Sequence, residues 1–407
     1  MHIEPALKEN FSSSKIKIKM IGVGGAGGNT VNTMIEKKLQ GIEFIACNTD
    51  WGDLNTSKAD FHIRLGERTT RGHGAGANKD LGRMAAEESS EEIKEHFQDA
   101  DLVILVAGLG KGTGTGASPT IVDTIKNIRN DDDDSEKLVV AIVFFPFQYE
   151  GDKRKANAED GLRELIKKVD TLIVVPNEKI REEYKNLSIV DAFKKADEII
   201  YNAARAITDL LVKKGYLEVD FRDILTTLGN KGYAYITCGE AEGENRAQEA
   251  AERAMTNPLL SDIDLKDSKG LLINFTSDPE LGLEEFYNAI SNITATAGTE
   301  GDVIHGYVID NEMSNKVRVT IIATGLNLTS ESYYDAPKEF VTSRNRSSYN
   351  AGSNPWDPIN KQADIDIDVS QHKPTISQPS PIEIEKKEEL NKVDNDIPAF
   401  YKKFNNN

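Results

Sequence analysis

The chain has 407 residues and a formal net charge of −18 at pH 7. This charge argues against binding to nucleic acid or to an anionic membrane surface, because both need clustered Lys and Arg. At about 100–200 residues per domain, the length predicts two domains and additional tails. The two cysteines, Cys47 and Cys238, have no Cys or His at ligand spacing, which argues against a disulfide framework or a zinc site.

The N-terminal segment predicts a strand that leads into a glycine-rich turn. Residues 1–14 form a polar leader without the apolar core of a signal peptide. Residues 15–21 alternate as a strand should, residues 22–28 are glycine-rich, and Asn29 begins a predicted helix. No run approaches the roughly 20 apolar residues of a membrane-spanning helix, so we expect a cytoplasmic protein without direct membrane insertion.

The first glycine-rich turn matches a dinucleotide-binding pattern. Gly22, Gly24 and Gly27 have the spacing of the fingerprint, and Asp50 follows the next predicted strand, at residues 43–47. An acid at that position binds ribose in dinucleotide-binding domains. An NAD-dependent oxidoreductase is therefore one hypothesis, although it leaves the later glycine-rich turns unexplained.

The next segment predicts an edge strand and a second glycine-rich turn. Residues 60–65 alternate between polar and apolar, residues 71–78 are rich in glycine, and a helix is expected at residues 79–97. His62 and His73 lie on the strand and in the turn, where we expect both side chains to be exposed rather than catalytic.

The central glycine-rich segment lies between a buried strand and a helix. Residues 102–107 are uninterrupted and apolar, residues 108–116 alternate with glycine, and Ser118 and Pro119 predict the start of a helix. Glycines let backbone N–H groups face a ligand, and a helix N-terminus favours negative charge. The segment therefore predicts a phosphate-binding site.

This segment differs from a P-loop. A P-loop has Gly-Lys followed by Ser or Thr, whereas Lys111 is followed by Gly112. Because the three glycine-rich turns are expected at one edge of a parallel sheet, they predict one extended ligand.

Two charged residues follow the next predicted strand. Residues 131–134 are four aspartates, which predict a solvated loop because no EF-hand spacing follows. Residues 138–145 predict a buried strand, after which Glu150 and Arg154 are candidates for binding ribose and base or phosphate, or for a surface ion pair. Residues 171–177 are expected to complete the sheet.

A long helix is predicted at residues 188–214, with apolar residues on more than one side, which indicates a position between two domains. Asp197 lies near its start. Asp220 and Asp223 share one face if a helix restarts between them. Residues 215–327 predict a smaller α/β domain. Its helices are expected at 247–255 and 283–293 and its strands at 233–238, 270–275, 303–309 and 317–323.

The C-terminal segment predicts a disordered linker at residues 328–393, which are rich in Asn, Ser, Pro and acidic residues. Residues 394–407 predict a short peptide that folds on binding a partner. Its candidate contact residues are Asp396, Ile397, Pro398, Phe400, Lys402 and Lys403.

Between about residue 15 and residue 325, the chain resembles the FtsZ family of tubulin-like GTPases. The matching blocks are residues 22–29, 48–50, 74–78, 108–116, 146–154, 191–193, 219–221 and 257–260. The resemblance implies an α/β fold with a Rossmann-type GTPase domain at residues 15–187 and a parallel sheet. It also implies a central helix at 188–214, a C-terminal domain at 215–327 and a disordered tail.

The resemblance also implies a function. Members of the family polymerise head to tail with GTP into the Z ring at the division septum, on the inner face of the membrane. They hydrolyse GTP to GDP at the subunit interface, with Mg²⁺ bound through the nucleotide. The C-terminal peptide is similar to one that binds membrane-anchoring division proteins such as FtsA.

By this likeness, Asp220 and Asp223 act from the neighbouring subunit on the water that attacks the γ-phosphate, a role that suits the positioning chemistry of phosphoryl transfer. Asn29 and Asp197 would recognise guanine. The implied nucleotide-binding residues are Gly24, Gly25, Ala26, Gly27, Gly28, Asn29, Gly110, Gly112, Thr113, Gly114, Thr115, Glu150, Arg154, Phe193 and Asp197.

Three positions depart from the family pattern: Lys111 and Lys79 replace a glycine and a proline, and Glu218 replaces an asparagine. A carboxylate about 4 Å from a phosphate charge costs on the order of 4 kcal/mol at an effective dielectric constant near 20. One hypothesis is that Lys111 of one subunit faces Glu218 of the next, so that reverting both costs less than the sum of the single reversions. The alternative is a GTP-binding filament protein or regulator with weak or no hydrolysis.

Overall fold

The computed structural model describes residues 16–128, 137–212, 220–229, 232–256, 265–298 and 302–326. The predicted leader, the aspartates at 131–134, the linker and the C-terminal peptide lie outside these residues, as does Glu218.

The described residues form one ten-stranded sheet with the order β3-β2-β1-β4-β5-β6-β7-β10-β8-β9. Strands from β3 to β7 in this order are parallel, β10 is antiparallel to both of its neighbours, and β9 is parallel to β8. The strands are β1 Ile18–Val23, β2 Ile42–Asn48, β3 Phe61–Arg64, β4 Leu102–Gly108, β5 Leu138–Phe145, β6 Thr171–Pro176, β7 Gly232–Glu242, β8 Gly270–Ser277, β9 Asp302–Ile309 and β10 Lys316–Leu326.

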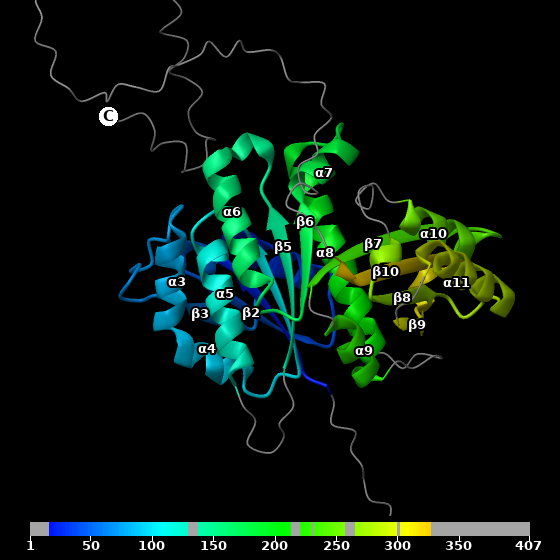
Figure 1. Ribbon diagram of the computed structural model, residues 1–407, viewed down its shortest axis with the longest axis horizontal. Coiled ribbons are helices and arrows are strands. Elements are labelled where there is room, and N and C mark those ends of the chain that lie inside the picture. The colour runs from blue at the N-terminus through cyan, green and yellow to red at the C-terminus, as the bar shows by residue number, and fades with distance from the viewer. Residues whose placement is uncertain are drawn as a thin grey trace, which may run out of the picture. The chain divides into compact units, whose positions relative to one another are not determined.

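Helices cover both faces of the parallel part of the sheet (Figure 1). The apolar residues of α1, α8 and α9 pack on one face, and those of α3, α4, α5 and α6 pack on the other. The α-helices are α1 Gly24–Glu36, α2 Trp51–Leu54, α3 Lys79–Glu88, α4 Ser90–Phe97, α5 Thr113–Lys126, α6 Asp152–Leu165, α7 Asn177–Glu183, α8 Ile189–Val212, α9 Phe221–Leu228, α10 Arg246–Met255 and α11 Leu283–Ala297.

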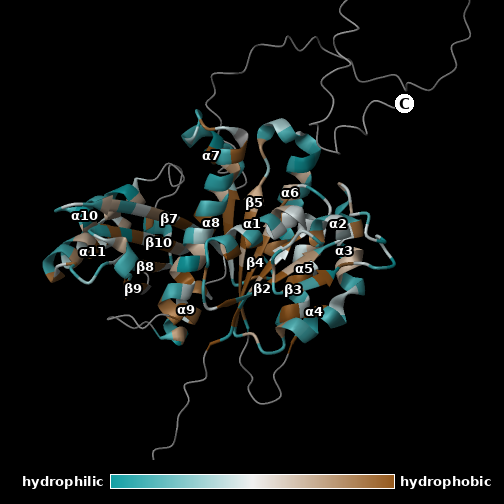
Figure 2. Cartoon of the chain, turned by 180° about the vertical axis from the view of Figure 1, so that it is seen from behind, coloured by the Kyte–Doolittle hydropathy of each residue, from teal (hydrophilic) through white to brown (hydrophobic). Residues whose placement is uncertain are grey.

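Hydropathy follows this layering. In Figure 2 the strands are mainly brown, and the outer helices carry teal, hydrophilic residues. Every residue of β1, β5 and β6 is buried, as expected for parallel strands covered on both faces. A third apolar cluster, formed by α10, α11 and the strands β7, β8 and β10, is the core of the C-terminal domain. No helix in the described ranges is long and apolar enough to span a membrane.

The predicted α/β class and the predicted edge strand are confirmed. Strand β3 ends the sheet, and three of its four residues are exposed, His62 among them. The prediction that residues 171–177 complete the sheet is wrong, because Thr171 of β6 pairs with Gly232 of β7. The sheet therefore continues into the C-terminal domain, which long-range strand pairing alone decides.

Two helices begin earlier than their sequence patterns predict. The expected starts at Asn29 and near Ser118 are wrong, since α1 begins at Gly24 and α5 at Thr113. Glycine is a poor helix former, so the pattern favours later starts.

Close contact with the sheet explains the glycine-rich starts. A Cβ atom added at Gly27 would lie 2.3 Å from the carbonyl oxygen of Val106, and one added at Gly114 would lie 2.2 Å from that of Gly108. Only glycine lets these helix backbones lie so close to β4, and this packing outweighs intrinsic propensity.

The helix predicted at residues 79–97 is interrupted. It consists of α3 and α4, which meet at Ser89. The Ser89 hydroxyl donates to the carbonyl oxygen of Arg64 at 3.2 Å and accepts from the N–H of Gly66 at 3.1 Å. A serine side chain that bonds to backbone groups competes with a continuous helix, which accounts for the break.

Candidate functional site

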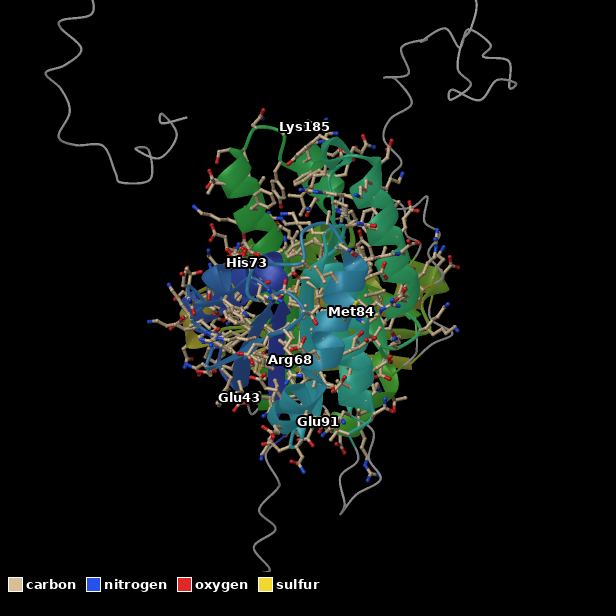
Figure 3. All side chains as sticks on the ribbon, turned by 90° about the vertical axis from the view of Figure 1, so that its left-hand side faces the viewer. Glu43, Arg68, His73, Met84, Glu91 and Lys185 are labelled. Carbon is tan, nitrogen blue, oxygen red and sulfur yellow. The ribbon has the colours of Figure 1, made fainter. Side chains whose placement is uncertain are left out.

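A cavity of about 730 Å³ lies at the carboxyl ends of β1, β4, β5 and β6. Its volume is in the range of small-molecule sites, and open α/β sheets bind their ligands at this edge. The loops after these strands line it, together with the loop at residues 73–76 and the first half of α8. His73, which belongs to this lining, lies on the side of the molecule that Figure 3 shows, together with Arg68 and Met84.

One end of the cavity is built from glycine backbone. Gly24 begins α1 with φ of 71°, and a Cβ atom added there would lie 3.3 Å from the backbone nitrogen of Gly114 in α5. The first turns of α1 and α5 therefore meet at the cavity. Two helix N-termini that meet in this way favour an anion, so this end of the cavity is suited to phosphate and is called the phosphate end.

The loops at the phosphate end hold one another in place. The N–H of Gly112 donates to the carbonyl oxygen of Gly76 at 2.8 Å, and the N–H of Gly74 donates to that of Thr49 at 3.0 Å. The hydroxyl oxygens of Thr49 and Thr113 are 2.6 Å apart. These bonds connect the loops at residues 49, 74–76 and 112–113 to one another.

The other end combines an aromatic ring with an ion pair. Phe193 on α8 lies edge-on to Phe147, with ring centroids 5.8 Å apart, and its own ring is about half exposed. Glu150 forms an ion pair with Arg154 and accepts from the N–H of Phe147 at 3.1 Å. An exposed ring beside hydrogen-bonding groups suits a stacked base and its ribose.

Asp197 lies in α8 between the two ends. Its carboxylate accepts hydrogen bonds from Thr30 at 2.8 Å and from Thr33 at 3.0 Å. Burial raises the pKa of Asp197, and the two threonine hydrogen bonds oppose this effect without cancelling it. A partly buried acceptor of this kind suits a ligand with N–H donors, such as guanine.

We expect the substitution Asp197→Asn to weaken nucleotide binding while changing the folding stability little. Because the folded-state pKa is raised above 3.8, the contribution of Asp197 to folding is greatest below that pH and is lost as pH rises through the folded-state pKa. The free energy of unfolding of the nucleotide-free variant should therefore lie within about 1 kcal/mol of that of the wild type. The stability of the variant relative to the wild type should increase as pH rises. GTP affinity should fall at least about tenfold, because the amide places a donor against donors. Thermal unfolding and GTP titration measure both effects, and equal GTP affinity would contradict the assigned role.

The structure brings nine of the predicted nucleotide-binding residues together. Those that line the cavity are Gly24, Gly25, Ala26, Asn29, Thr113, Gly114, Glu150, Phe193 and Asp197. Gly27, Gly28, Gly110, Gly112, Thr115 and Arg154 are not part of this lining. Thr115, for example, is buried and accepts from the N–H of Gly110 at 2.8 Å, so it shapes the loop. Direct contact of any of these residues with a nucleotide stays a prediction.

Sequence reasoning missed Asn177 as a site residue. It follows β6, lines the cavity and is 7% exposed, and its Oδ1 atom is buried without a hydrogen-bond partner among the described residues. An unsatisfied buried acceptor costs about 1–3 kcal/mol, which a donor on a bound ligand would offset. Its position at the carboxyl end of a predicted strand was the available signal.

The predicted catalytic pair lies away from the cavity. Asp220 caps α9 by accepting from the N–H of Arg222 at 3.2 Å, Asp223 is in the first turn, and both are exposed. The cavity contacts the first half of α8, whereas α9 follows the other end of this helix (Figure 1). The 24 residues of α8 span about 36 Å. Within one chain, the pair and the cavity are thus separated, and the action of the pair from a neighbouring subunit stays a prediction.

Comparisons with known proteins agree with this geometry. Residues 17–185 match the family described as Tubulin/FtsZ family, GTPase domain, and residues 232–327 match FtsZ family, C-terminal domain. Fold and site therefore define a GTPase of the tubulin/FtsZ class. The NAD-dependent oxidoreductase hypothesis is wrong, because the fingerprint glycines belong to this GTPase domain.

Curated relatives show to which family within the tubulin/FtsZ class the chain belongs. The chain is 43% identical to the cell division protein FtsZ of Pseudomonas putida over 321 residues, 79% of each chain. It is 44% identical to that of Wolbachia sp. over 317 residues, 76% of this chain and 80% of the relative. The solved FtsZ dimer from M. jannaschii superposes with a TM-score of 0.72 at 38% identity, covering 79% of this chain and 92% of that one. The chain belongs to the FtsZ family of cell-division GTPases.

Proposed function

We propose that this GTPase assembles head to tail, with GTP, into filaments of the Z ring, and hydrolyses GTP where two subunits meet. The observation that carries the proposal is the separation of the cavity from Asp220 and Asp223 by the length of α8. In a head-to-tail filament the exposed carboxylates of one subunit approach the cavity of the next. The M. jannaschii relative, solved as a dimer, supports self-association.

Exposed apolar side chains in two separate places support such a contact. Beside the cavity, Tyr149 stacks on Phe147 and is 71% exposed, and Val190 in the lining is 63% exposed. At the start of α11 in the C-terminal domain, Leu283 is 83% exposed and Tyr287, one helical turn later, is 63% exposed. A head-to-tail contact needs two different surfaces of one chain, which these two groups supply.

In this proposal GTP lies along the cavity with its phosphates on the glycine loops and its base at Phe193. Mg²⁺ binds together with the nucleotide through its phosphate oxygens, as phosphoryl-transfer chemistry implies. Asp53, an exposed carboxylate in the cavity lining, is available to its water shell, whereas Asp50 is engaged in capping α2. The ion supplies neutralisation of phosphate charge.

The protein acts in the cytoplasm, at the septum, and its C-terminal peptide binds a membrane-anchoring division protein such as FtsA. The charge of the whole chain supports a protein partner rather than nucleic acid. Deletion of residues 394–407 is expected to leave GTP-dependent assembly unchanged and to abolish recruitment to vesicles that carry the anchor. Equal recruitment of the truncated chain would contradict the role of the peptide.

Light scattering of the purified full chain tests the main proposal. We expect a rise on addition of GTP, no comparable rise with GDP, and phosphate release that begins with assembly. Leu283→Glu should raise the protein concentration needed for assembly about tenfold or more, because burying a charge in an apolar contact is costly. Met84→Glu, at an exposed residue of α3 outside both apolar groups, is the matched control. A chain that stays monomeric and binds no GTP would contradict the proposal.

A second candidate function is GTP-dependent assembly with weak or no hydrolysis. The observation that favours it is the departure from the family pattern at Lys111 and Glu218. Phosphate release measured beside light scattering separates the two, since filaments without turnover would support the second candidate.

A further inference from the structure

Lys111 places a cation at the phosphate end of the cavity. It is exposed, lines the cavity and lies two residues before the first residue of α5. Its neighbours in the chain fix the loop: Gly110 has φ of 103°, and the N–H of Gly112 donates to the carbonyl oxygen of Gly76 at 2.8 Å. The backbone on both sides of Lys111 is thus constrained, while its side chain projects from a loop that faces the ligand space.

The other charged groups of the lining are already engaged, apart from Asp53. Glu150 is paired with Arg154, Asp197 accepts from two threonines, and Asp50 caps α2. Of the two lysines that line the cavity, Lys194 lies 3.4 Å from the carboxylate of Asp191, at the base end.

Lys111 differs from Lys194 in having no ion pair or hydrogen bond within the described ranges. An ammonium on a flexible stem, unpaired and beside glycine loops that favour anions, is matched in charge to a phosphate.

We infer that Lys111 binds the terminal phosphate of the nucleotide and makes the site prefer the triphosphate over the diphosphate. The inference rests on the proposed function, since it takes GTP as the ligand of this cavity. GTP carries a γ-phosphate and more negative charge than GDP, so a cation that reaches the γ-phosphate adds more affinity for GTP than for GDP. A glycine at this position can supply only a backbone N–H group.

Nucleotide titration of three single variants tests this role. The full chain, stripped of nucleotide and kept below its assembly concentration, is titrated with GTP and with GDP at low and high potassium chloride. We expect Lys111→Met to weaken GTP binding about tenfold, or about 1.4 kcal/mol, and to weaken GDP binding much less. Lys111→Arg should retain the preference for GTP. Lys94→Met, which removes an ion-paired lysine of α4 outside the cavity, is the matched control and should leave both affinities unchanged.

The dependence of GTP affinity on salt concentration is a second test of this role. The wild-type affinity for GTP should fall more steeply with potassium chloride than that of Lys111→Met, because the variant has lost a charge contact that salt screens. Unchanged GTP affinity in Lys111→Met would overturn the inference. If that variant binds GTP normally but needs a higher concentration to assemble, Lys111 acts across the subunit contact instead, as in the pairing with Glu218. A wild-type chain that binds neither nucleotide would contradict the proposed function itself.

Discussion

Replacement of both Asp220 and Asp223 by asparagine is expected to lower GTP turnover about 100-fold or more, as loss of a group that positions or polarises a reacting water does. GTP binding should be unchanged, because the cavity lies at the other end of α8. Asparagine caps a helix about as well as aspartate, so α9 should stay folded. Glu91→Gln, at an exposed acid in the first turn of α4, is the control for a simple loss of surface charge.

A mixing experiment shows whether the two aspartates act from the neighbouring subunit. The double variant keeps its cavity but lacks the acids, whereas a variant that binds no GTP keeps the acids but lacks a working cavity. Each alone should be inactive. Mixed filaments contain contacts in which an intact cavity meets intact acids, so the mixture should recover part of the activity. A mixture that assembles but stays inactive would contradict action between subunits.

Gly27→Ala is expected to be much more damaging than the same change at the neighbouring Gly28. The added Cβ would lie 2.3 Å from the carbonyl oxygen of Val106 and 2.9 Å from the carbonyl carbon of Gly22, so α1 must move away from the sheet. Overpacking of this kind typically costs about 1–3 kcal/mol, and here the obstacles are backbone atoms, which cannot move aside as a flexible side chain can. Because α1 also positions Gly24 and Gly25 at the phosphate end, we expect loss of GTP binding together with lower thermal stability.

The neighbouring residue provides the matched control. A Cβ atom added at Gly28 meets nothing within 4 Å, and Gly28 lies within α1, where alanine is favoured over glycine by about 1 kcal/mol. Gly28→Ala should therefore keep or raise the melting temperature of the nucleotide-free chain, which differential scanning calorimetry measures. Equal melting temperatures for the two variants would contradict the close packing of α1 against β4 at Gly27.

The local sequence predicts the parallel half of the sheet well, because strands buried on both faces consist of uninterrupted apolar residues. Residues 102–107 and 138–145 correspond to β4 and β5 within one residue. The central glycine loop, at residues 108–116, was recognisable for a similar reason, since it directly follows such a run. The starts of α1 and α5 were not, because glycine has a low helix propensity and only contact with β4 shows why it is there.

The sequence by itself determined the α/β class and the three glycine-rich turns, because periodicity and loop chemistry are local properties, whereas the choice of Asp220 and Asp223 followed from the family resemblance. Only the tertiary structure decided that β6 pairs with β7 to join two domains in one sheet, that Asn177 lines the cavity, and that α8 separates the cavity from the acids. These features depend on contacts between residues far apart in the chain. A one-dimensional pattern contains no record of such distances, so the separation between the cavity and Asp220 and Asp223 could be measured only in the fold.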